Sequence, residues 1–83
     1  MAEKEIGMVT DYFTKVEVAA VKLSGSLKIG DRIRIRGSTT DFEQEVESMQ
    51  IDRKTVQKAK KGDEIGIKVN DRVRRNDKIY LAS

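Results

Sequence analysis

Carboxylates, lysines and arginines are the side chains that could do chemistry in this chain, because the sequence contains no cysteine and no histidine. Thiolate nucleophiles, imidazole proton carriers and the common zinc sites are therefore excluded. Asp41 with Glu43, and Asp63 with Glu64, have the composition of general acid–base pairs. Each pair lies in a predicted turn or near arginines, which favours a solvated surface. We expect no catalytic residue, no metal site and no enzymatic activity.

Gly25 and Gly30 have the glycine spacing of a phosphate-binding loop. The lysine and the hydroxyl residue that such a loop requires are replaced by Asp31 and Arg32, and a carboxylate at this position would repel phosphates. The segment is better explained as a turn that begins a strand, in which glycine permits unusual backbone angles. We therefore expect no bound nucleotide and no other cofactor.

Positive charge is concentrated in the C-terminal part of the chain. Residues 1–52 hold seven basic and ten acidic residues, a net charge of −3, whereas residues 53–83 hold ten basic and four acidic ones, a net charge of +6. If the basic segments are neighbours in space, they form one patch that attracts phosphates; otherwise they are two unrelated solvated loops. The candidate nucleic-acid-binding residues are Arg53, Lys54, Lys58, Lys60, Lys61, Arg74 and Arg75.

Alternation of apolar and polar residues predicts an all-β fold. The predicted strands cover residues 6–13, 16–23, 31–36, 42–51, 64–69 and 78–81. Residues 52–61 lack the alternation and fit one short helical turn, with Asp52 as N-cap and Gly62 after its end. A small sheet avoids exposed edges by closing on itself, so we expect a single domain over residues 1–83 that forms a closed six-stranded β-barrel. The sequence shows no linker and no evident internal repeat.

Charges on two predicted strands suggest a hairpin with a defined register. Three arginines alternate with isoleucines in residues 32–36, and three glutamates alternate with other residues in 43–47. The predicted pairs are Arg36 with Glu43, Arg34 with Glu45 and Arg32 with Glu47, with Ile33 opposite Val46 inside. The arginine stripe is then a solvated ladder; the alternative is that it binds phosphate directly.

Three segments resemble domain 2 of the translational GTPases, the β-barrel domain of factors such as elongation factor Tu, elongation factor 1A and initiation factor 2. The first is residues 25–35, with its two glycines and the alternation after Asp31. The second is residues 46–51 continued by residues 56–69, which contain Ala59, Gly62, Asp63 and Gly66, and the third is residues 73–77. The resemblance implies a closed Greek-key barrel of the translation-factor domain 2 type over almost the whole chain.

The same resemblance implies a function in translation. In elongation factors, domain 2 helps to hold the aminoacylated end of tRNA through a glutamate and a basic residue, whose positions are occupied here by Gln50 and Arg53. We therefore expect a free-standing, non-enzymatic module that resembles a translation elongation factor and binds tRNA, rRNA or the ribosome. The alternative is an accessory docking module for a separately encoded larger factor or enzyme, because similar barrels occur as accessory domains of other proteins, including some peptidases.

Composition sets the remaining expectations. No segment approaches the roughly 20 apolar residues of a membrane-spanning helix, and the N-terminus has no signal-peptide pattern. We expect a monomer in the cytoplasm with no membrane partner. The charge-rich, cysteine-free composition also fits a thermostable protein.

Overall fold

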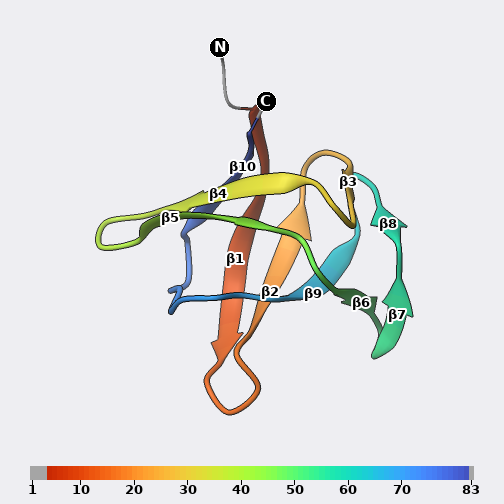
Figure 1. Cartoon of the computed structure of the whole chain (residues 1–83), viewed down its shortest axis with the longest axis horizontal. Coiled ribbons are helices and arrows are strands. Elements are labelled where there is room, and N and C mark those ends of the chain that lie inside the picture. Colours follow the sequence, from red (N-terminus) through yellow and green to blue (C-terminus); the bar gives the residue numbers. More distant parts are fainter. Residues whose placement is uncertain (1–3, 83) are drawn as a thin grey trace.

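The computed structural model describes residues 4–82, which form ten β-strands and no helix (Figure 1). The all-β prediction is confirmed. The strands are β1 (Lys4–Phe13), β2 (Val18–Leu23), β3 (Leu27–Lys28), β4 (Arg32–Arg36), β5 (Asp41–Glu45), β6 (Met49–Ile51), β7 (Lys54–Val56), β8 (Lys58–Ala59), β9 (Glu64–Lys68) and β10 (Lys78–Leu81). Among residues 4–82 there is accordingly no helix that could cross a membrane.

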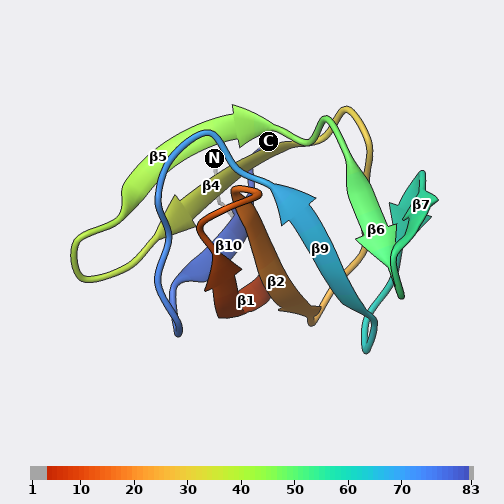
Figure 2. The ribbon, with the colours of Figure 1, turned by 90° about the horizontal axis from the view of Figure 1, so that it is seen from below.

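Eight of the strands form one antiparallel sheet in the order β5-β4-β10-β1-β2-β9-β6-β7, and β3 pairs with β8 in a separate two-stranded sheet. Figure 2 shows that the large sheet curls around, with β5 and β7 as its two outer strands. Alternate residues of the central strands point into one core, in which Val9, Ile33, Ile35 and Ile79 are fully buried.

The closed six-stranded barrel predicted from the sequence is wrong, because the sheet is a curled, open half-barrel. The outer strands β5 and β7 do not pair in the described residues. The side chain of Gln44 on β5 instead reaches the end of β9: its Nε2 donates to the Lys68 carbonyl oxygen at 2.8 Å, and its Oε1 accepts from the Asn70 N–H at 2.7 Å. An amide side chain thus joins strands that no ladder joins.

Irregularities in β1 help the sheet to curl. Its register shifts once against β10, between Glu5 and Gly7, and once against β2, between Val9 and Asp11. Bulges of this kind bend a strand and increase its local twist. Gly7 is buried at the first shift, where a Cβ atom would lie 2.8 Å from Cγ1 of Val21. Any larger residue would force β1 and β2 apart.

Two local predictions also require correction. The single strand expected at 42–51 is divided into β5 and β6. The helical turn expected in 52–61 is absent, since these residues form β7 and β8. The cause is a tight turn at Asp52 and Arg53, whose φ angles of 54° and 67° match the type I′ turn that favours a hairpin over a helix.

A four-residue turn occurs three times, each time just before a core strand. The turns are Lys28–Asp31, Lys60–Asp63 and Arg74–Asp77. In each, the aspartate N–H donates to the carbonyl oxygen of the first residue, and the aspartate carboxylate accepts from the N–H of that residue at 2.9–3.0 Å.

The third residue of each turn has a positive φ: 93° at Gly30, 94° at Gly62 and 74° at Asn76. This angle at the third position is that of a type II turn, which glycine and asparagine adopt most readily. The turns lead into β4, β9 and β10, so the chain does contain a short internal repeat that the sequence analysis did not identify.

The β4–β5 hairpin has the predicted outer face but a different register. Arg36 lies opposite Asp41, Arg34 opposite Glu43 and Arg32 opposite Glu45, and Ile33 faces Gln44 rather than Val46. The loop is shorter than predicted, because the N–H of Gly37 donates to the Thr40 carbonyl oxygen at 2.7 Å and β5 begins directly after it. A shift of two residues keeps each side chain on its face, so the charged stripe still points outward.

Candidate functional site

A hollow with a volume of about 710 Å³ lies beside the two-stranded sheet. It is lined by Ser26, Leu27, Lys28, Asp31, Lys58, Ala59, Lys60, Asp63 and Leu81. Leu27 and Ala59 belong to the core, whereas Leu81 is only half-buried. The hollow therefore combines an apolar floor with a charged rim, the usual character of a ligand-binding site.

Two copies of the repeated turn build this hollow. Strand β3 leads into the turn Lys28–Asp31, and β8 leads into the turn Lys60–Asp63. The two strands run antiparallel, with Leu27 opposite Ala59 and Lys28 opposite Lys58. Because Leu27 and Ala59 point inward, the two lysines project from the other side of the pair.

The rim of the hollow carries more positive than negative charge. Residues directly opposite in an antiparallel pair are near neighbours, and like charges there repel each other. The ammonium groups of Lys28, Lys58 and Lys60 are exposed, and none of them forms an ion pair with any residue between 4 and 82. The carboxylates of Asp31 and Asp63 each accept a main-chain N–H of their own turn, and these two negative charges face three lysines. The rim can therefore accept additional negative charge.

The predicted site residues between positions 50 and 61, apart from Lys58 and Lys60, lie outside this hollow. Gln50 is exposed on β6, Arg53 is in the type I′ turn, and Lys54 begins the outer strand β7. Lys61 is exposed in the second turn and does not line the hollow. Lys58 and Lys60 are thus the two predicted residues that the structure places inside it.

Arg74 and Arg75 lie elsewhere. Figures 1 and 2 place the segment that contains them beside β5 and β10, on the side of the molecule away from β6 and β7. Arg74 lines a separate hollow of about 300 Å³ with Thr39, Asp41 and Asp71, and Arg75 forms an ion pair of 3.8 Å with Asp11. The predicted residues do not form one continuous basic patch.

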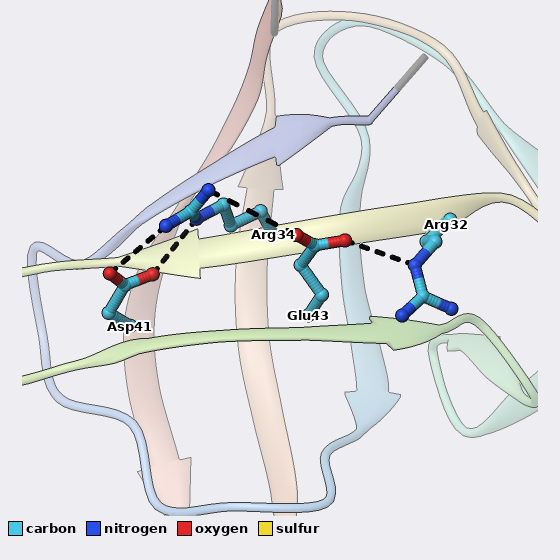
Figure 3. Close-up of polar contacts among 4 residues, drawn as sticks. All are labelled: Arg32, Arg34, Asp41 and Glu43. Carbon is cyan, nitrogen blue, oxygen red and sulfur yellow. Dashed lines mark hydrogen bonds and ion pairs between the residues drawn. The ribbon is translucent and has the colours of Figure 1, made fainter.

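The arginine stripe of β4 is engaged by carboxylates (Figure 3). Arg34 makes two hydrogen bonds to Asp41, of 2.9 and 3.1 Å, and lies 4.0 Å from Glu43, whose other oxygen accepts from Arg32 at 3.0 Å. The hydrogen bond from Arg34 is the main reason that the pKa of Asp41 is lowered from its ordinary value. This part of the surface is a self-paired network and a poor phosphate site.

Several residues of the hollow were not singled out from the sequence. Lys28 and Asp31 appeared there only as parts of a rejected nucleotide loop, and Leu81 as the end of a strand. The available signal was the recurrence of a basic residue, a glycine or asparagine two positions later, and then aspartate. Two copies at 28–31 and 60–63 would have suggested that these segments are equivalent, although their spatial proximity needs the fold.

Comparisons with known structures define the fold class. The chain superimposes on the C-terminal domain of a protein described as a U32 peptidase from Geobacillus thermoleovorans with a TM-score of 0.90 and 17% sequence identity, covering 96% of this chain and 93% of that one. The selenomethionine form of the same domain gives a TM-score of 0.88 at 18% identity. The two chains therefore share one fold.

Sequence relatives carry names of the same kind. The chain is 50% identical over 78 residues to an uncharacterized protease of Methanocaldococcus jannaschii, covering 93% of this chain and 19% of that protein. It is 43% identical over 77 residues to a collagenase of Porphyromonas gingivalis, covering 90% of this chain and 21% of the collagenase. The chain thus spans about a fifth of the length of these relatives. No protein-family model matches it.

These relationships correct the functional predictions. The resemblance to domain 2 of the translational GTPases is wrong as an assignment, since the similar proteins are named protease, collagenase and U32 peptidase. The expected partners, tRNA, rRNA and the ribosome, are wrong for the same reason, since the similar proteins carry protease and peptidase names. The expectation that the chain has no enzymatic activity is contradicted by the same names, which are those of proteases. Glycine turns and alternating strands are features that unrelated barrels share, which is why fold-level patterns misled the functional assignment.

Proposed function

We propose that this chain is a peptidase-type β-domain that binds polypeptide and thereby contributes to protein cleavage. The observation that carries the proposal is the 50% identity to a named protease, which extends over 93% of this chain. Identity at that level over nearly the whole chain supports a role related to that of the aligned region of the relative. The collagenase relative and the superimposable U32 peptidase domain point in the same direction.

The geometry supports a binding role for this domain. A hollow of about 710 Å³ with an apolar floor and charged rim can accommodate amino-acid side chains. The outer strand β7 ends the large sheet, and an extended polypeptide can add to such an edge by main-chain hydrogen bonds. Both features lie at the same end of the sheet, since β8 follows β7 directly.

Equilibrium binding to an unfolded protein tests the proposal. Fluorescently labelled β-casein and gelatin would be titrated with the purified chain, with fluorescence anisotropy as the readout and unlabelled bulk tRNA as the competitor. We expect saturable binding of at least one of these proteins that an equal mass of tRNA does not displace. Absence of binding to both at about 100 µM chain, or displacement by tRNA at lower concentration than by unlabelled casein, would contradict the proposal.

A further inference from the structure

We propose that the lysine-bearing rim of the hollow between the turns Lys28–Asp31 and Lys60–Asp63 binds an acidic segment of an extended polypeptide, with carboxylate side chains at the lysines. The inference deepens the proposed function and rests on it. It names the site and the chemical class of polypeptide that the site selects.

Charge complementarity is the first argument. Lys28 and Lys58 are held directly opposite each other by the β3–β8 register, and neither has an ion-pair partner among the described residues. Lys60 brings a third unpaired ammonium group to the same rim. A carboxylate placed between the opposed lysines would relieve their repulsion. Three ammonium groups fit an acidic segment with more than one carboxylate better than they fit a single chain end.

The carboxylates that line the hollow do not pair with its lysines. The two carboxylates within the hollow, Asp31 and Asp63, each accept a main-chain N–H at 3.0 Å and hold a turn in place. Both carboxylates keep their negative charge, but neither forms an ion pair with a lysine of the hollow in the described residues. Other cations of the chain, such as Lys78 with Glu5, do have carboxylate partners.

The floor distinguishes polypeptide from nucleic acid. Leu27 and Ala59 are almost wholly buried and Leu81 is half-buried, and no aromatic side chain is among the described residues that line the hollow. Proteins that bind single-stranded nucleic acid stack its bases on aromatic rings or guanidinium groups, and the cations here are lysines alone.

The probe for the test is an eight-residue peptide of alternating glutamate and leucine, acetylated at its N-terminus, amidated at its C-terminus and labelled with rhodamine. Two matched peptides replace every glutamate by glutamine or by lysine. We expect the acidic peptide to bind the purified chain about tenfold more tightly than the glutamine peptide, with the difference reduced at 0.5 M salt. Equal binding of all three peptides would overturn the inference, as would tighter binding of an eight-nucleotide RNA of mixed sequence.

The decisive variant is Lys58→Glu, because it separates binding from folding. It replaces the opposed lysines by a lysine–glutamate pair, so we expect the melting temperature of the free chain to rise while binding of the acidic peptide falls about tenfold or more. Lys61→Glu makes the same charge change one residue beyond the hollow, and Lys15→Glu makes it in the β1–β2 loop. Both controls should bind nearly as the parent chain does.

The outcomes of the two experiments are distinguishable. If Lys58→Glu and Lys61→Glu weaken binding equally, the hollow is not the site and the inference fails. If the chain binds β-casein but shows no preference for the acidic peptide, the inference fails and the proposed function stands. If it binds neither, both fail.

Discussion

The side chain of Gln44 donates a hydrogen bond of 2.8 Å to the main-chain carbonyl oxygen of Lys68, across the open side of the curled sheet. Its amide oxygen accepts from Asn70 nearby, so both ends of a buried amide are used. The strands β5 and β9 are not neighbours in the sheet, and this side chain connects them. One glutamine therefore takes over part of the role that strand pairing has in a closed barrel.

The connection through Gln44 should be important for stability. We predict that Gln44→Leu lowers the free energy of unfolding by about 1–3 kcal/mol, because it removes two hydrogen bonds made by a buried amide. Urea unfolding followed by circular dichroism measures the change. The control is Gln57→Leu, at an exposed position, where we expect a change below about 0.5 kcal/mol. Similar losses in the two variants would show that the amide has no special role.

Gly37 and the buried Asp77 are packed against each other. A Cβ atom at Gly37 would overlap Oδ1 of Asp77, whose other oxygen accepts from the Arg74 N–H at 2.9 Å. We predict that Gly37→Ala destabilises the chain by about 1–3 kcal/mol, since the carboxylate cannot move without losing that bond. Thermal unfolding would detect the loss. Ser38→Ala, at the exposed neighbouring position, is the control, and an unchanged Tm for Gly37→Ala would refute the packing argument.

The type I′ turn between β6 and β7 carries backbone strain. Arg53 has a φ of 67°, a conformation that glycine adopts without a steric penalty. Arg53→Gly should therefore raise the free energy of unfolding by about 0.5–1 kcal/mol, measured by urea titration. In contrast, Lys54→Gly, one residue further in the strand, should lower it. A destabilised Arg53→Gly variant would mean that the arginine side chain makes a compensating contribution.

The ion pairs of the β4–β5 hairpin predict a dependence on pH. Because Arg34 lowers the pKa of Asp41 in the folded chain, the folded state binds the proton less readily than the unfolded state. The stabilisation is present above the ordinary aspartate pKa and is lost as the pH falls through the lowered value. The difference in stability between the parent chain and Asp41→Asn should therefore be largest near pH 7 and shrink below about pH 4.

The control for this pH series is Glu47→Gln, since Glu47 is exposed and forms no ion pair with any described residue. Its stability relative to the parent chain should change less at pH 7. A difference for Asp41→Asn that stays constant from pH 7 to pH 3 would argue against the linkage to Arg34.

Local patterns predicted much of the secondary structure and little of the site. The alternation of Ile33 and Ile35 with arginines correctly indicated β4 and its outer face. The hairpin register was predicted wrongly because a shift of two residues preserves the inside–outside pattern. Arg34 faces a glutamate in either register, Glu43 or Glu45, so the charge pattern does not distinguish the two. The turn at Asp52 and Arg53 was read as a helix start, since aspartate is common both at helix N-caps and in tight turns.

The site depends on long-range pairing that residue types do not reveal. Lys28 and Lys58 are 30 positions apart in the chain, and only the β3–β8 register brings them together. Arg74 and Lys60 begin two copies of the same repeated turn, yet these turns lead into different strands, β10 and β9, and line different hollows. Segregation of charge along the sequence was therefore a poor guide to its distribution on the surface.

The measurement that most directly tests the central claim, a role in protein cleavage, is a domain replacement in the Porphyromonas gingivalis collagenase. The 77-residue region that matches this chain would be replaced by it, and collagen cleavage would be compared with that of the native enzyme and of a form lacking the region. We predict that the replacement cleaves collagen within about tenfold of the native rate, whereas the deletion loses most of its activity. A deletion form as active as the native enzyme, or a folded replacement as inactive as the deletion, would contradict the claim.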